Sequence, residues 1–177
     1  MQAGSQAPRF KLVLVGDAAV GKSTFLMRHL CGEFERKHIP TMTSQPRDLQ
    51  FYTTIGALCF EVWDCPPSPE AVRESLVDAS GVIIAFDASQ KETTKGARSW
   101  YKLVRDSAGE SLLVAVCGFK ADLRVRSRTP VKVPGVPYWP VSARSNYNFE
   151  KPFLFFARRL TGYHHRSLTR DTFECPH

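Results

Sequence analysis

A phosphate-binding loop is the strongest chemical motif in this sequence of 177 residues. Residues 16–23 read Gly-Asp-Ala-Ala-Val-Gly-Lys-Ser and fit the pattern G-x-x-x-x-G-K-[ST]. The glycines let the backbone curl so that successive N–H groups point at phosphate oxygens. Lys22 is suited to hold the outer phosphates, and the Ser23 hydroxyl suits a Mg²⁺ ion. A chance glycine-rich turn is the alternative, but an apolar strand before the motif and a helix after it favour the functional reading.

Two further motifs have the chemistry to hold a purine base. Lys120 and Asp122 follow one predicted strand, and Ser142-Ala143-Arg144 follows another. A carboxylate at Asp122 can accept two hydrogen bonds from the ring N–H and exocyclic amine of guanine, a pair that adenine does not offer. A plain surface turn is the alternative for Lys120 and Asp122 taken alone. Their order behind a phosphate loop favours guanine binding over a P-loop ATPase or kinase.

The elements that must position these residues alternate along the chain. Apolar runs and turn residues predict strands over 10–15, 48–53, 57–63, 81–86, 111–116 and 138–141. Helices are predicted over 22–30, 70–78, 93–105 and 149–160, with loops over 31–47, 65–69 and 123–137. Strands that are apolar throughout and alternate with helices indicate an α/β fold. We expect a mostly parallel six-stranded sheet with helices on both faces.

With the phosphate and base motifs in this order, the chain resembles the Ras superfamily of small GTPases, and its match to one branch, Ran, is close. The resemblance is carried by residues 10–37, "FKLVLVGDAAVGKSTFLMRHLCGEFERK", and 142–160, "SARSNYNFEKPFLFFARRL". It implies a small-GTPase G-domain over 10–162, between an N-terminal tail (1–9) and a short basic C-terminal tail (163–177). It also implies GTP or GDP with Mg²⁺ as ligands and a role in nucleocytoplasmic transport. Nuclear transport receptors and Ran-type regulators are then the expected partners, in the nucleus and cytoplasm.

The same resemblance assigns roles residue by residue. Lys22 and Thr41 act on the γ-phosphate, and the metal is held by Ser23, Thr41 and Asp64. Nucleotide contacts are implied for Asp17, Ala18, Ala19, Val20, Gly21, Lys22, Ser23, Thr24, Phe34, Thr41, Lys120, Asp122, Ser142, Ala143 and Arg144.

The family's switch II begins D-x-x-G-Q, whereas this segment (residues 64–68) reads Asp-Cys-Pro-Pro-Ser. Pro67 has no N–H to donate to the γ-phosphate, and Ser68 is too short to orient the attacking water. Ala18 adds a methyl group where relatives carry glycine, which crowds an arginine finger. In related GTPases these elements and the arginine account for a factor on the order of 10⁵, or roughly 7 kcal/mol. We therefore expect GTP hydrolysis to be slow or lost.

The base motif also departs from the family, because Phe119 stands where relatives carry asparagine. A phenyl ring cannot make the hydrogen bonds that tie the base loop to the phosphate loop, and each lost link costs roughly 1–3 kcal/mol. Nucleotide affinity should therefore fall. The second hypothesis is a pseudo-GTPase, a G-domain used as a protein-binding module without turnover.

Charge and composition restrict the remaining possibilities. The net charge is +7, and all of the excess lies from Lys120 onward, where 11 basic residues face 4 acidic ones. Such a surface favours acidic partners, although a merely solvated face is the alternative. The basic residues Arg124, Arg126, Arg128 and Lys132 have no aromatic residues between them, so direct nucleic-acid binding is not expected. The chain is also expected to be a monomer. We expect no membrane span, secretory signal or prenylation box, and no disulfide framework among five cysteines.

Overall fold

The computed structural model describes residues 7–32, 41–53, 56–123, 131, 133–163 and 168. The strands are β1 (Arg9–Gly16), β2 (Gln45–Thr53), β3 (Gly56–Asp64), β4 (Gly81–Asp87), β5 (Leu113–Phe119) and β6 (Tyr138–Pro140). The helices are α1 (Lys22–Cys31), α2 (Pro69–Ser75), α3 (Lys91–Ala108) and α4 (Lys151–Thr161), with a short 3₁₀ turn at Ala121–Leu123.

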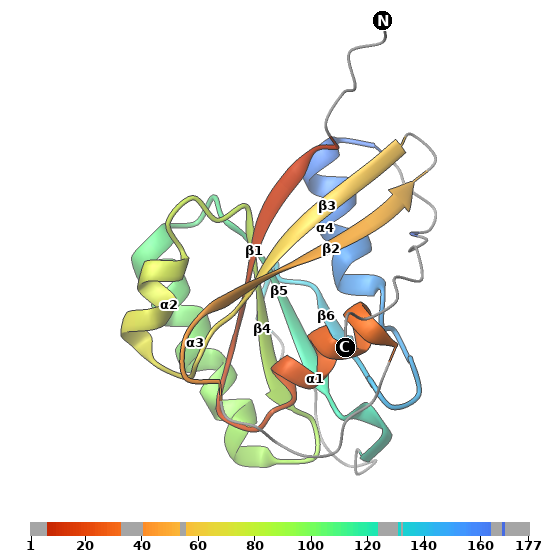
Figure 1. The fold of residues 1–177 in the computed structure, drawn as a ribbon. Coiled ribbons are helices and arrows are strands. Elements are labelled where there is room, and N and C mark those ends of the chain that lie inside the picture. Colours follow the sequence, from red (N-terminus) through yellow and green to blue (C-terminus); the bar gives the residue numbers. More distant parts are fainter. Residues whose placement is uncertain are drawn as a thin grey trace, which may run out of the picture.

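The six strands form one sheet in the order β2-β3-β1-β4-β5-β6 (Figure 1). Strands β3, β1, β4, β5 and β6 are parallel to one another, and only β2 runs antiparallel, against β3. This arrangement confirms the expected α/β fold with a mostly parallel sheet. The parallel pairs require crossover connections, which the helices supply.

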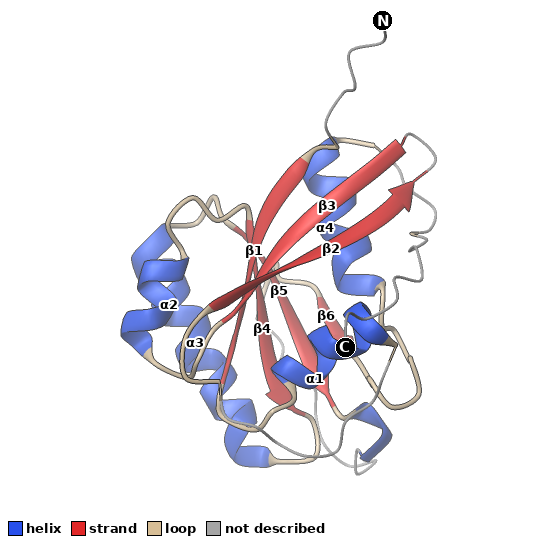
Figure 2. Cartoon of the chain, in the orientation of Figure 1, coloured by secondary structure: helices blue, strands red, loops and turns tan. Residues whose placement is uncertain are grey.

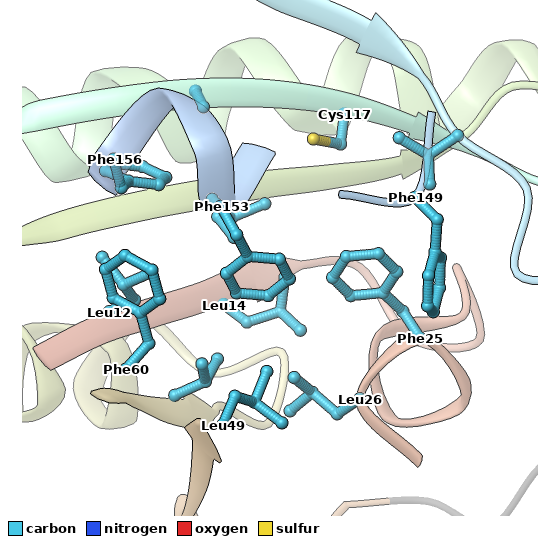
Figure 3. Close-up of a cluster of buried hydrophobic side chains, with 14 of the residues drawn as sticks. Leu12, Leu14, Phe25, Leu26, Leu49, Phe60, Cys117, Phe149, Phe153 and Phe156 are labelled. Carbon is cyan, nitrogen blue, oxygen red and sulfur yellow. The ribbon is translucent and has the colours of Figure 1, made fainter. Parts of the chain in front are cut away.

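Helices cover both faces of the sheet (Figure 2). On one face, Phe25 of α1 and Phe153 and Phe156 of α4 pack with Leu12 and Leu14 of β1 (Figure 3). On the other face, α2 and α3 pack against alternate residues of the same strands through Val72, Ala97, Trp100 and Val104. Since both faces are covered, β4 is buried at every one of its positions.

Several boundaries differ from the predicted ones. Strand β2 begins at Gln45, so Pro46 lies inside a strand rather than a loop; proline is tolerated there because β2 is an edge strand. Helix α2 begins at Pro69, the first helical position, which suits proline because its missing N–H would have no partner. Strand β5 runs to Phe119, three residues beyond the predicted end.

The strand extends through Gly118 because the glycine permits close packing. A Cβ atom at Gly118 would lie 2.7 Å from the hydroxyl oxygen of Tyr138 in β6. The longer strand carries Phe119 directly to the edge of the sheet where the predicted site residues gather.

Two expectations about composition can be compared with the structure. Among the described helices, none is long and apolar enough to cross a lipid bilayer. Cys59, Cys65 and Cys117 are free and buried, and the expectation of no disulfide framework stays a prediction. The predicted domain boundaries stay a prediction.

Candidate functional site

The predicted site residues gather at the carboxyl-terminal edge of the parallel strands. Strand β1 ends at Gly16, β3 at Asp64, β4 at Asp87 and β5 at Phe119. In α/β sheets, ligands bind in the crevice outside these strand ends. The fold therefore brings the phosphate loop, the Asp64 segment and the base motif to one edge.

Lys22 lies inside the phosphate loop, at the first residue of α1. Its ammonium group donates hydrogen bonds of 2.8 Å to the main-chain oxygens of Gly16 and Asp17. Burial lowers the pKa of Lys22, while the charges of Asp64 and Asp17 act in the opposite direction. The loop thus holds one desolvated cation beside the N-terminus of a helix, where anionic phosphates are favoured.

The remaining loop residues differ in exposure. Ala18 and Ala19 are exposed at the surface of the loop. Val20 is buried, and its side chain anchors the loop to the hydrophobic core. Ala19 has a φ of +59°, the left-handed region that side chains other than glycine rarely adopt. Gly21 caps α1 at a φ of +105°, and Thr24 is half-buried on the first turn of the helix.

Three oxygen-bearing side chains converge beside Lys22. The Ser23 hydroxyl donates to Oδ2 of Asp64 at 2.5 Å and lies 2.9 Å from the Thr41 hydroxyl, which lies 3.4 Å from the same carboxylate oxygen. Asp64 is 7% exposed, and within the described part of the chain its buried Oδ1 has no hydrogen-bond partner. Burial raises the pKa of Asp64.

This donor set fits a magnesium ion. Mg²⁺ prefers hard oxygen ligands such as hydroxyls and carboxylates, and it usually keeps several waters. A buried carboxylate oxygen without a partner costs free energy, and a cation at this place would satisfy it. Ser23, Thr41 and Asp64 are therefore the residues that would hold the metal.

The base motif is held in place by hydrogen bonds of its own. Ser142 donates to Oδ1 of Asp122 at 2.6 Å, and the exposed guanidinium of Arg144 lies 3.9 Å from the other carboxylate oxygen. Ala143 packs against the hydrophobic core between them. The structure therefore brings Asp122 and the Ser142–Arg144 turn together, as the sequence predicted.

Lys120 connects the base motif to the phosphate loop. Its ammonium group donates to the main-chain oxygen of Ala19 at 2.9 Å and to Oδ2 of Asp87 at 2.8 Å. Asp87 is 1% exposed, so this ion pair is largely shielded from water on one side. Sequence reasoning missed Asp87, although a carboxylate at the end of a wholly apolar strand is a signal that could have found it.

Phe119 points into the core beside the phosphate loop. It is 3% exposed, and its ring centroid lies 4.7 Å from that of Phe25 in α1. A Cβ atom at Gly21 would lie 3.8 Å from the ring, so the two loops meet there. Phe119 thus replaces a polar link between the loops with apolar packing, and Lys120 supplies the polar one.

The switch II segment (residues 64–68) is followed at once by a capped helix. The Ser68 hydroxyl accepts from the main-chain N–H of Ala71 at 3.4 Å and donates to Oε2 of Glu70 at 3.0 Å. Ser44, just before β2, lies 3.5 Å from the Cys65 sulfur and 3.1 Å from the Ser75 hydroxyl. These contacts connect the segment to β2, and sequence reasoning found neither Ser44 nor Ser75.

Two residues complete the comparison with the sequence-based assignments. Phe34 lies outside the described residues. Trp100 of α3, which sequence reasoning missed, donates its indole N–H to the Asp17 carboxylate at 2.8 Å. Nothing in the sequence pattern points from the middle of a helix to a loop 83 residues away.

One comparison with known proteins bears on this site. The family model described as Ras family matches residues 11–162 of the chain. The match spans the phosphate loop, the three oxygen ligands, the switch II segment and the base motif.

Proposed function

The chain belongs to the Ras family of small GTPases, and from this premise we propose that it is a Ran-like protein with slow or absent GTP hydrolysis. Family membership brings guanine-nucleotide binding with Mg²⁺. We further propose a role in nucleocytoplasmic transport, with nuclear transport receptors as partners in the nucleus and cytoplasm.

One observation supports the proposal about hydrolysis. The phosphate and metal side of the site is complete, with Lys22 inside the loop and Ser23, Thr41 and Asp64 converging. The residue that would orient the attacking water is missing, because Ser68 stands at its position and its hydroxyl caps α2. A site that can hold a nucleotide but cannot orient the attacking water favours a long-lived GTP complex.

Each polar residue has a distinct part in that complex. Lys22 neutralises phosphate charge from within the loop, and Asp122 accepts hydrogen bonds from the guanine edge. Mg²⁺, when bound, neutralises the charge that develops on the phosphates. Pro67 offers no N–H to the γ-phosphate, so the segment that normally senses this group does not respond to it.

The Ran-like role is supported by sequence likeness. Residues 10–37 and 142–160 resemble the corresponding Ran segments, and the excess positive charge beyond Lys120 suits acidic receptor surfaces. Binding of purified importin-type receptors to GTP-loaded and GDP-loaded protein tests this part. Tight binding by neither form contradicts it.

A pseudo-GTPase is the second candidate, favoured by Phe119 and by the contacts of the switch II segment. Phe119 is buried against Phe25 and offers the base no hydrogen bond. The contacts of Ser44 with Cys65 and Ser75 hold the segment through side chains of the protein itself. A domain built this way can present a constant surface to a partner.

The nucleotide content of the purified protein separates the two candidates. The protein is purified with Mg²⁺ and denatured, and the released nucleotide is identified by chromatography. Near-stoichiometric GTP supports binding without hydrolysis, and an empty site favours the pseudo-GTPase. GDP means either that hydrolysis persists or that GDP is the preferred ligand, and the turnover assay decides between them. Lys22→Ala is the control that should release no nucleotide.

A GTPase assay with and without a Ran-type activating protein then measures turnover directly. We expect no acceleration by the activating protein. Turnover near ordinary activated rates would contradict the reasoning from Pro67 and Ser68.

A further inference from the structure

A contact between α3 and the phosphate loop lies outside every role assigned above. Trp100 is 8% exposed, and its indole N–H donates to Oδ1 of Asp17 at 2.8 Å. A hydrogen bond to an ionised acceptor is among the stronger ones in proteins, worth about twice a neutral one. Trp100 therefore fixes the side chain of the second residue of the loop.

Gly96 lies one helical turn before Trp100, on the same face of α3. A Cβ atom built at Gly96 would lie 2.1 Å from Oδ2 of Asp17. The carboxylate therefore rests against the bare main chain of the helix. Glycine in a helix interior costs up to about 1 kcal/mol relative to alanine. At this position only glycine leaves room for the Asp17 carboxylate.

The side chain of Asp17 is thus held on two sides, while its main chain serves the site. The main-chain oxygen of Asp17 accepts a hydrogen bond from the ammonium group of Lys22 at 2.8 Å. One residue connects α3 to the cation that faces the phosphates. A shift of Asp17 would move an oxygen that orients Lys22.

The loop needs outside support because it contains a strained residue. Ala19 has a φ of +59°, which costs an L-residue with a Cβ roughly 1–2 kcal/mol. Lys120 holds the main-chain oxygen of Ala19 at 2.9 Å, on the side of the loop facing the base motif. Asp17 is the second point at which the loop is held from outside.

The placement of Asp17 also has an electrostatic effect. A carboxylate in a phosphate-binding loop repels anionic phosphates, and the repulsion grows as the distance shrinks. The hydrogen bond from Trp100 and the close approach to Gly96 keep this negative charge directed at the helix. Asparagine would keep the acceptor oxygen and remove the charge.

We propose that Trp100 and Gly96 are positioning residues for nucleotide binding, which hold the phosphate loop in its binding shape through Asp17. The inference rests on the proposed function only in that the loop binds the phosphates of a guanine nucleotide. It is independent of hydrolysis and of any transport role.

The test measures binding of Mg²⁺-GDP and of inorganic pyrophosphate by calorimetry, together with thermal unfolding of each variant. Trp100→Phe keeps the ring and removes the N–H donor. We expect it to weaken the binding of both ligands about tenfold, which corresponds to the loss of one charge-assisted hydrogen bond. Trp139→Phe, in β6, is the matched control and should leave both affinities unchanged.

Gly96→Ala separates positioning from stability. Its methyl group displaces the Asp17 carboxylate and should weaken the binding of both ligands. Because alanine favours the helix by up to about 1 kcal/mol, the loss of stability should be smaller than in Trp100→Phe. Asp17→Ala removes the acceptor of the Trp100 hydrogen bond and should resemble Trp100→Phe. A merely structural role predicts instead that affinity falls only where stability falls.

The outcomes distinguish this inference from the proposed function. Wild-type affinities in both Trp100→Phe and Gly96→Ala would overturn it, as would a wild-type protein that binds neither probe. A wild-type protein that binds pyrophosphate but not GDP would contradict guanine-nucleotide binding. Pyrophosphate would still report the effect of each variant, and the expected weakening would support the inference.

Discussion

Replacing Phe119 by asparagine, the residue that the family carries, should lower the stability of the protein and raise its affinity for the nucleotide. Phe119 is 3% exposed, and its ring is tilted against that of Phe25 with a centroid distance of 4.7 Å. Truncating a buried phenylalanine costs about 3–5 kcal/mol from lost apolar burial and the cavity left behind. We expect Phe119→Asn to lower the free energy of unfolding of the nucleotide-free protein by about that amount.

The affinity should change in the opposite direction. The ring lies beside the main chain of Gly21, since a Cβ atom there would lie 3.8 Å away, so an amide at this position can link the two loops. One such link contributes about 1–3 kcal/mol, which raises GDP affinity by a factor of about 5–150.

Urea unfolding in the absence of nucleotide measures the stability, and titration with a fluorescent GDP analogue at low temperature measures the affinity. Phe119→Leu is the control, because it keeps an apolar side chain and should cost less than about 1.5 kcal/mol with no gain in affinity. The reasoning fails if Phe119→Asn leaves stability unchanged. It also fails if affinity falls together with stability, because Phe119 would then itself support the nucleotide.

Three further predictions concern the framework around the site. Ser68→Ala removes the cap acceptor for Ala71 and should cost about 1 kcal/mol in urea unfolding; no change would exclude the cap as a stabilising contact. Gly81→Ala should cost about 1–3 kcal/mol by the same assay, because its Cβ would lie 2.4 Å from Phe156; unchanged stability would show that the core can repack freely. The Arg9 hydrogen bond, with a smaller contribution from Trp63, lowers the pKa of Glu61 from the ordinary 4.5. The stability advantage of wild type over Glu61→Gln should be full at pH 7 and disappear as pH falls below 4.5 through the lowered pKa; a difference independent of pH would contradict this.

The fold was predictable because its signals are local. Apolar runs such as residues 10–15 and 81–86 mark strands buried on both faces, and the phosphate-loop pattern fixes a strand, a turn and a helix in order. The residues at which strands begin and end were less predictable. Pro46 marks a break by its sequence, yet an edge strand accommodates it because one side of the strand makes no ladder bonds.

The site was predictable where one motif carries its own geometry, as with Lys22 and Ser23. The contacts between motifs were not predictable. Lys120 reaches Ala19 across 101 residues, and Trp100 reaches Asp17 across 83. Such pairs depend on how the strands are ordered in the sheet, and no periodicity in the sequence encodes that order.

The two edges of the sheet determine how this protein can associate. At one edge, β2 carries Pro46 followed by the exposed charges of Arg47 and Asp48. At the other edge, β6 has only three residues and ends at Pro140. Proline and charge on an edge strand, and the shortness of the other edge strand, disfavour pairing with a strand from another chain.

Main-chain pairing along the sheet is therefore a poor route both to self-assembly and to capture of an extended peptide. Side chains on the helices and loops are then the more favourable surface for a partner to recognise. Its specificity can then be changed by single surface substitutions that leave the sheet intact.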